Sequence, residues 1–205
     1  APEGEDIYTV HADGTGLALF AGGTFLFAGG VPASRIAKWD GSSWSALGSG
    51  VSSSVYSIAV FDDGSGMALH AGGAFTIAGG IAASRIAKWD GSSWSALGSG
   101  TNLQVNALAT FDDGTGEALY AGGYFTIAGG LAANRIAKWN GSEWSPLGSG
   151  MDGPVSVLTV FDDGSGPALY AGGDFTIAGG VGANRIAKWD GSNWAALGSS
   201  GMSSA

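Results

Sequence analysis

The fold of this 205-residue chain is decided by the stretch ASRIAKWDGSSWSALGSG at residues 83–100, because the same letters also stand at residues 33–50. The surrounding pattern recurs every 50 residues along the chain and places all eight tryptophans in register: Trp39, Trp89, Trp139, Trp189, and Trp44, Trp94, Trp144, Trp194. Ala-Gly-Gly triplets recur in the same way from Ala21, Ala71, Ala121 and Ala171, and from Ala28, Ala78, Ala128 and Ala178. A fixed period of this length indicates a repeat protein, in which each unit buries its apolar face against its neighbours.

One repeat reads as four antiparallel strands. In the second copy, segments rich in β-branched and aromatic residues alternate with Asp-Gly pairs, at Asp63-Gly64 and Asp90-Gly91, which favour tight hairpin turns. Gly79-Gly80 is expected to be a loop. The strands are expected over Val55–Phe61, Met67–Phe75, Arg85–Trp89 and Trp94–Leu97.

Four strands and about 50 residues per unit are typical of a β-propeller blade. We therefore expect an all-β fold, a single repeat domain over 1–205 with four-stranded antiparallel blades at about 5–50, 51–100, 101–150 and 151–200. The first strand is expected at Asp6–Ala12 and the last at Trp194–Leu197, so no overlapping strand closes the ring. Four blades could close alone, form half of an eight-bladed ring, or belong to a longer chain. We favour the eight-bladed ring, a homo-oligomer joined through the terminal blades, with a filament as the result if the rotation does not close.

The repeat also resembles known families. The pattern Ala-Gly-Gly-x-Phe … Arg-Ile-Ala-Lys-Trp-Asp-Gly-x-x-Trp-x-x-Leu-Gly resembles kelch-type blades and is similar to repeats of bacterial exported propellers and of the fungal Rax2 cell-surface polarity proteins. The resemblance covers all four units. It implies a propeller that serves as a binding scaffold, and it brings no catalytic motif.

The composition of the chain argues against several classes of binding partner. A formal net charge of −9 and a pI near 4.3 argue against binding to nucleic acid or anionic membranes, which select basic patches. No apolar run is long enough for a membrane-spanning helix, so no membrane insertion is expected. The lack of cysteine excludes disulfides and thiolate metal sites. The chain starts at Ala1-Pro2 without Met, which suggests signal-peptide removal or excision from a longer chain, and we expect an extracellular or cell-surface location.

Two acidic motifs are candidate sites. Paired carboxylates in Gly-rich turns could bind calcium, but the ligand spacing of known calcium loops is missing, so hairpin turns are predicted instead. These turns are Asp62-Asp63-Gly64, Asp112-Asp113-Gly114 and Asp162-Asp163-Gly164, with Ala12-Asp13 in the first copy. The segment Asp40-Gly41-Ser42-Ser43-Trp44 is similar to the Asp-box of sialidase propellers but one residue shorter. Asn140 replaces this aspartate in the third copy, which favours a backbone role.

The aromatic and basic repeat positions also allow two interpretations. The tryptophans could stack on sugars in a multivalent lectin with one site per blade, but packing between blades is the favoured reading. The basic residues are expected to form blade-to-blade ion pairs: Arg35, Arg85, Arg135, Arg185, Lys38, Lys88, Lys138 and Lys188. His11 and His70 stand where other copies have Phe61 and Tyr120, so they are read as aromatic replacements without a metal role.

We therefore expect a non-enzymatic structural or interaction scaffold that self-assembles, with no catalytic, cofactor or metal residues and an unidentified protein or glycan ligand. No serine has the surroundings of a nucleophile. A propeller glycosidase would need acids that differ between blades, and these are scattered at Glu117, Glu143, Asp152 and Asp174. Unit-specific recognition is expected in the loops that differ, Val51–Ser54, Thr101–Gln104 and Met151–Pro154.

Overall fold

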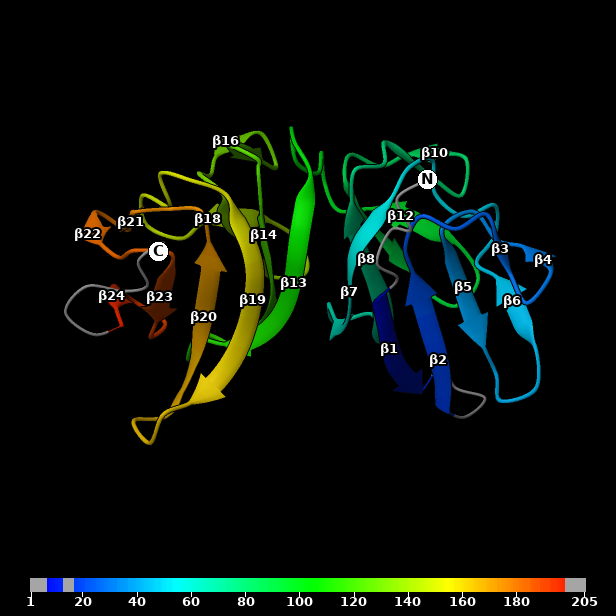
Figure 1. Cartoon of the computed structure of the whole chain (residues 1–205), viewed down its shortest axis with the longest axis horizontal. Helices are drawn as coiled ribbons and strands as arrows, with labels where there is room; N and C mark the ends of the chain where they lie inside the picture. Colours follow the sequence, from blue (N-terminus) through cyan, green and yellow to red (C-terminus); the bar gives the residue numbers. More distant parts are fainter. Residues whose placement is uncertain (1–6, 13–16, 198–205) are drawn as a thin grey trace, which may run out of the picture. The chain divides into compact units, whose positions relative to one another are not determined.

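The computed structural model describes residues 7–12 and 17–197, and within them it contains strands and turns but no helix. The chain divides into two compact units, residues 1–100 and 101–205. Each unit contains two four-stranded antiparallel sheets with their short hairpins (Figure 1), and we call each such sheet with its hairpin a blade. An all-β fold built from four repeated four-stranded sheets is thus confirmed.

Unit 1 holds blades 1 and 2. Blade 1 consists of β1 (Ile7–Ala12), β2 (Leu17–Gly22), β3 (Phe27–Ala28), β4 (Val31–Pro32), β5 (Ile36–Trp39) and β6 (Trp44–Ala46). Blade 2 consists of β7 (Val55–Asp62), β8 (Met67–Gly73), β9 (Ile77–Ala78), β10 (Ile81–Ala82), β11 (Ile86–Trp89) and β12 (Trp94–Ala96).

Unit 2 holds blades 3 and 4. Blade 3 consists of β13 (Val105–Asp112), β14 (Glu117–Gly123), β15 (Ile127–Ala128), β16 (Leu131–Ala132), β17 (Ile136–Trp139) and β18 (Trp144–Pro146). Blade 4 consists of β19 (Val155–Asp162), β20 (Pro167–Gly173), β21 (Ile177–Ala178), β22 (Val181–Gly182), β23 (Ile186–Trp189) and β24 (Trp194–Ala196).

The four long strands of each blade follow one another in sequence order, as in β13-β14-β17-β18. This agrees with the four strands expected per repeat, apart from their ends. The third strand of blade 2 begins at Ile86 and not at Arg85, because Arg85 has a φ of 67° and leaves the extended conformation. The equivalent arginines of the other three blades have the same left-handed conformation.

The two-stranded hairpins were missed by the sequence analysis, which expected only a Gly-Gly loop. In blade 2, Ile77 pairs with Ala82 and Ala78 pairs with Ile81 around Gly79-Gly80. Gly79 has a φ of 57°, and a Cβ there would lie 2.6 Å from the ring of Trp94. The hairpin therefore lies directly on the ring of Trp94. It was not predicted because strands of two residues are too short to show an alternation of apolar and polar residues.

Candidate functional site

The two faces of a blade differ in chemistry. Side chains alternate along a strand and cross-strand partners share a face, so the register defines both faces. In blade 3, face A carries the residues Ala107, Phe111, Tyr120, Gly122, Ile136 and Lys138. Face B carries the residues Leu108, Leu119, Ala121, Trp139 and Trp144. The other blades have the same two faces at the equivalent positions.

Within unit 2, face A of blade 3 packs against face B of blade 4. One buried cluster joins Phe111 and Tyr120 of blade 3 to Leu169 and Trp194 of blade 4. A Cβ on Gly122 would lie 2.5 Å from the Val155 side chain, so the glycine allows this close approach. The absence of a side chain on one face therefore makes room for the neighbouring blade.

Within unit 1, face A of blade 1 packs against face B of blade 2 in the same way. Phe20 and Ile36 share a buried cluster with Leu69 and Trp94. The indole Nε1 of Trp94 donates a hydrogen bond to the Leu47 carbonyl oxygen over 2.8 Å. In unit 2, Trp194 Nε1 donates in the same way to the Leu147 carbonyl oxygen over 3.3 Å. The predicted packing of tryptophans between blades is confirmed for Trp94 and Trp194.

Face A of blade 4 is partly exposed in the described part of the chain. The Phe161 side chain is 59% exposed, whereas Phe111 at the equivalent position of blade 3 is 5% exposed. Val157 is 55% exposed, against 6% for Ala107. This sheet face therefore presents two large apolar side chains to solvent.

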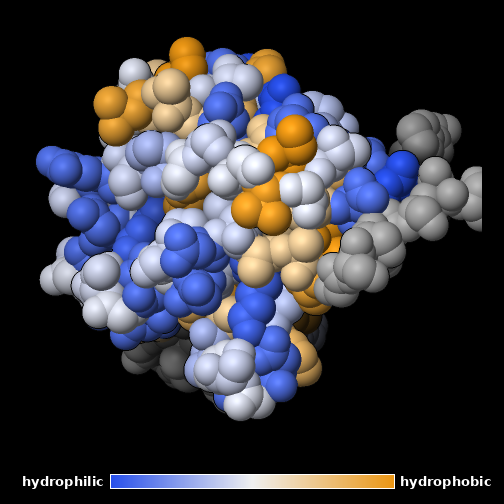
Figure 2. All heavy atoms as spheres, turned by 90° about the vertical axis from the view of Figure 1, so that its left-hand side faces the viewer, coloured by the Kyte–Doolittle hydropathy of each residue, from blue (hydrophilic) through white to orange (hydrophobic). Residues whose placement is uncertain are grey.

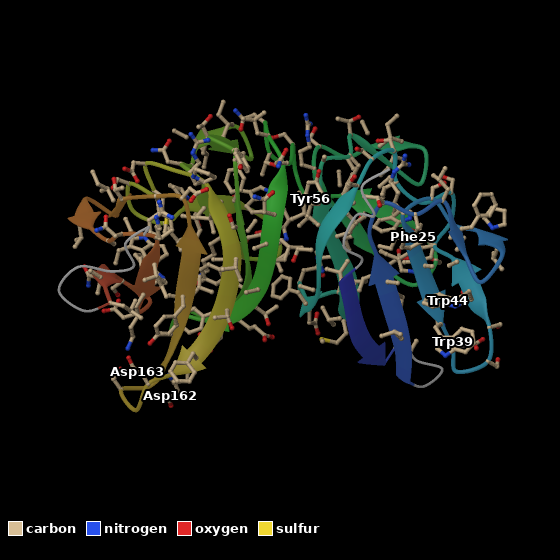
Figure 3. All side chains as sticks on the ribbon, viewed as in Figure 1. Phe25, Trp39, Trp44, Tyr56, Asp162 and Asp163 are labelled. Atoms are coloured by element: carbon tan, nitrogen blue, oxygen red, sulfur yellow. The ribbon has the colours of Figure 1, made fainter. Side chains whose placement is uncertain are left out.

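Face B of blade 1 is also partly exposed among the described residues. Leu19 and Trp44 are half-buried, whereas the equivalent Leu69 and Trp94 of blade 2 are buried. Trp39 and Trp44 lie next to each other on β5 and β6, with ring centroids 5.5 Å apart (Figure 3). The tryptophan pair that fills the contact between blades elsewhere is thus accessible in blade 1.

The acidic turns are held by their own carboxylates. Asp62 Oδ1 accepts hydrogen bonds from the backbone N–H groups of Gly64 and Gly66, and Asp112 and Asp162 do the same in blades 3 and 4. Figure 3 shows Asp162 and Asp163 at the turn between β19 and β20. The turn prediction is confirmed in these three copies, and Asp13 lies outside the described residues. In the part of the chain that the structure describes, no group of three or more acids and histidines could hold a metal ion.

The Asp-Gly turn between the third and fourth strands has a backbone role. Asp40 Oδ1 accepts hydrogen bonds from the N–H groups of Ser42 and Ser43, and these bonds hold the pKa of Asp40 well below its usual range. Asn140 Oδ1 accepts the same pair of bonds from Ser142 and Glu143. The interpretation of the Asn140 exchange is confirmed, because only an oxygen acceptor is needed here.

Three of the four lysines form ion pairs inside their own blade, so the expected blade-to-blade pairing is wrong for Lys88, Lys138 and Lys188. Lys138 Nζ lies 2.6 Å from Asp113 Oδ2, and the Tyr120 hydroxyl donates to the same oxygen over 2.8 Å. Blades 2 and 4 repeat the ion pair with Lys88–Asp63 and Lys188–Asp163. The cross-strand register places the lysine beside residue 120 and within reach of the turn, which explains the local pairing.

The arginines bind backbone oxygens where their contacts are described. Arg35 donates to the Val51 carbonyl oxygen over 3.2 Å, and Arg135 donates to that of Tyr124. Among the described residues the expected arginine ion pairs are not found, and Arg35 and Arg135 make these backbone contacts. His70 is buried against Phe61 with ring centroids 5.6 Å apart, which fits its reading as an aromatic replacement. Burial lowers the pKa of His70 to about 4. The side chain of His11 lies outside the description.

The Asp113 cluster gives a pH prediction. Burial alone raises the pKa of Asp113, but hydrogen bonds from Lys138 and two hydroxyl groups outweigh it and lower the pKa to about 2. Since the folded pKa lies below the unfolded one, the cluster stabilises the fold above pH 4 and loses this contribution as the pH falls from about 4 to 2. We expect Asp113→Asn to lower the free energy of unfolding at pH 7 by about 2 kcal/mol.

Urea denaturation at pH 7 and between pH 4 and 2 measures this effect. The variant should lose less stability than the wild type across the acid range. The exposed Glu117 of the same blade supplies a control, and Glu117→Gln should leave both values within about 0.5 kcal/mol of wild type. Equal acid slopes in Asp113→Asn and wild type would contradict the assignment.

The loops that differ between blades share a structural role that sequence reasoning missed. The side-chain oxygens of Ser52, Asn102 and Asp152 each accept hydrogen bonds from the first backbone N–H groups of the following hairpin, at residues 76–77, 126–127 and 176–177. The sequence contained a signal for this role, because all three residues stand at the same repeat position and carry a side-chain oxygen. Leu103 and Tyr124 stand at positions that differ between the repeats, and their side chains are exposed.

Exposed apolar side chains also mark the hairpins. Each blade presents one apolar pair there, namely Phe27 and Val31, Ile77 and Ile81, Ile127 and Leu131, and Ile177 and Val181. On the side of the molecule drawn in Figure 2, hydrophobic spheres gather at the top and in a band at the centre, among hydrophilic ones. These pairs therefore differ from the end face of blade 4, where the apolar residues continue a sheet face that is buried in the preceding blade.

Comparison of the chain with family models, with curated proteins and with solved structures found no match in any of the three. The described residues include no helix with the length and hydropathy needed to cross a membrane.

Proposed function

We propose that this chain is a non-enzymatic β-propeller scaffold of an exported or cell-surface protein that assembles through its terminal blades. The observation that carries the proposal is the pair of partly exposed apolar faces among the described residues, face A of blade 4 and face B of blade 1. Each has the residue types that are buried between blades inside a unit. Burial of apolar area is the main driving force of protein association, so exposed faces of this kind favour assembly.

The polar groups support a structural function. The carboxylates of the acidic turns are engaged by backbone N–H groups and lysines, and the amino group of each described ion pair is held by a carboxylate. A general acid or base has to reach a substrate, whereas these groups satisfy their own turns. The repeated polar residues thus stabilise the blades.

The mass in solution tests the proposal. Light scattering across a range of protein concentrations should give a species larger than the 20.2 kDa chain, with the fraction rising with concentration. A strictly monomeric 20.2 kDa species at all concentrations would remove self-assembly from the proposal.

A multivalent lectin is the alternative function. Five of its candidate stacking residues are buried, Trp94, Trp139, Trp144, Trp189 and Trp194, which disfavours sugar binding on them. A glycan array probed with the full chain at high concentration separates the two functions. Specific binding that Trp39→Ala abolishes would favour the lectin, and no binding would reject it.

A further inference from the structure

The exposed faces of blades 1 and 4 keep the apolar residue types that are buried between blades. A repeat with a polar outer face needs no neighbour to cover it, whereas these two faces are apolar. Blade 4 keeps phenylalanine at Phe161 and has the larger apolar Val157 where blade 3 has Ala107. Blade 1 likewise keeps Leu19 and both tryptophans. Both ends therefore retain the chemistry of an internal contact.

The two ends are complementary, and unit 2 supplies the pattern of the contact. There, Leu169, Trp189 and Trp194 of face B pack in one cluster with Phe111 of face A. Blade 1 presents the same residue types at Leu19, Trp39 and Trp44, and blade 4 presents Phe161. A blade 1 placed on blade 4 would bring these same residue types together, with Trp44 Nε1 directed at the Leu197 carbonyl as Trp194 Nε1 is at Leu147. The contact would differ at one point, because Val157 of blade 4 fills the space over Gly172 that Gly122 leaves open for Val155.

We propose that face A of blade 4 binds face B of blade 1 in a second copy of this chain. The contact joins two different surfaces, so it is heterologous and runs head to tail. Used twice by two copies, it closes a two-fold ring of eight blades. This inference rests on the proposed function and adds to it the partner, the surfaces and the direction of the contact.

The first experiment measures the mass of the full chain and of two variants by sedimentation equilibrium. Wild type should have twice the mass of one chain. Phe161→Glu places a charge in the contact and should weaken dimerisation about 30-fold or more, the effect of a residue worth about 2 kcal/mol at an interface. Ile177→Glu changes an exposed apolar residue of the blade 4 hairpin and should keep the wild-type dissociation constant.

The second experiment tests the direction of the contact. Leu19→Lys should also give single chains, because it changes face B of blade 1. Mixing it with Phe161→Glu should restore a dimer, since the mixture pairs one intact blade 4 face with one intact blade 1 face. If circular dichroism shows that Leu19→Lys is unfolded, Trp39→Lys replaces it.

The outcomes separate the inference from the proposed function. A monomeric wild type overturns both, because the end faces then have no second copy. A dimer that Phe161→Glu leaves intact, or that Leu19→Lys leaves intact, overturns the inference and retains assembly. A mixture that stays monomeric overturns the head-to-tail direction, and a wild-type mass above two chains overturns the two-fold ring.

Discussion

Trp94→Ala is expected to lower the free energy of unfolding by about 3–5 kcal/mol, the usual cost of removing a large buried aromatic side chain. The Trp94 ring is 7% exposed and packs in the cluster that joins blades 1 and 2. The substitution empties this space and leaves the Leu47 carbonyl oxygen without its indole donor. Thermal and urea denaturation followed by far-UV circular dichroism measure the loss without relying on tryptophan fluorescence.

Trp44→Ala is the matched control, because Trp44 holds the same repeat position in blade 1, whose face B is partly exposed. Its ring is half-buried, so we expect a loss of about 1–2 kcal/mol. Both variants should be made in the Phe161→Glu background, which is designed to remove the proposed contact with a second copy. Equal losses for Trp94 and Trp44 would contradict the assignment of face B as the surface buried between blades.

Gly129→Ala is expected to lower the free energy of unfolding by about 3 kcal/mol. Gly129 has a φ of 61°, in the left-handed region that costs an L-residue about 1–2 kcal/mol. In addition, its Cβ would lie 2.8 Å from Trp144 Cβ and 2.9 Å from Cδ1, so the hairpin has to move off the ring, which adds about 1–3 kcal/mol. Urea denaturation of the full chain measures the total.

Gly130→Ala separates the cost of a left-handed backbone from the cost of a clash with the tryptophan ring. Gly130 has a φ of 84°, but a Cβ there meets nothing within 4 Å. Gly130→Ala should therefore show the backbone cost alone, about 1–2 kcal/mol. If the two alanine variants were equally stable, the close contact between the hairpin and Trp144 would be refuted.

Much of the blade could be predicted because its signals are local. Strand residues between Asp-Gly pairs located the four long strands, and the acceptor oxygen shared by Asp40 and Asn140 predicted their turn role. The hairpin at Ile77–Ala82 escaped prediction because two-residue strands are stabilised by tertiary contact with Trp94. The lysine pairs were misplaced because Lys138 and Asp113 are 25 residues apart, and only the strand register brings them together.

The candidate site was predictable only in outline. The sequence predicted blades that pack against one another, but it could not say which face of a strand would be exposed. Leu158 and Phe161 stand three residues apart on β19, and the register places them on opposite faces. The two residues also differ in burial, since Leu158 belongs to the unit 2 core and Phe161 is exposed.

The sequence by itself determined the period, the antiparallel strands, the turns and the apolar character of both blade faces, because these depend on backbone preference and alternation over a few residues. Only the tertiary structure decided which face meets which neighbour, where the lysines pair, and that Phe161 is exposed and Trp44 only half-buried. The physical reason is that the four repeats are nearly alike, so their residues differ in burial through the presence or absence of a neighbouring blade, and that neighbour is defined in space.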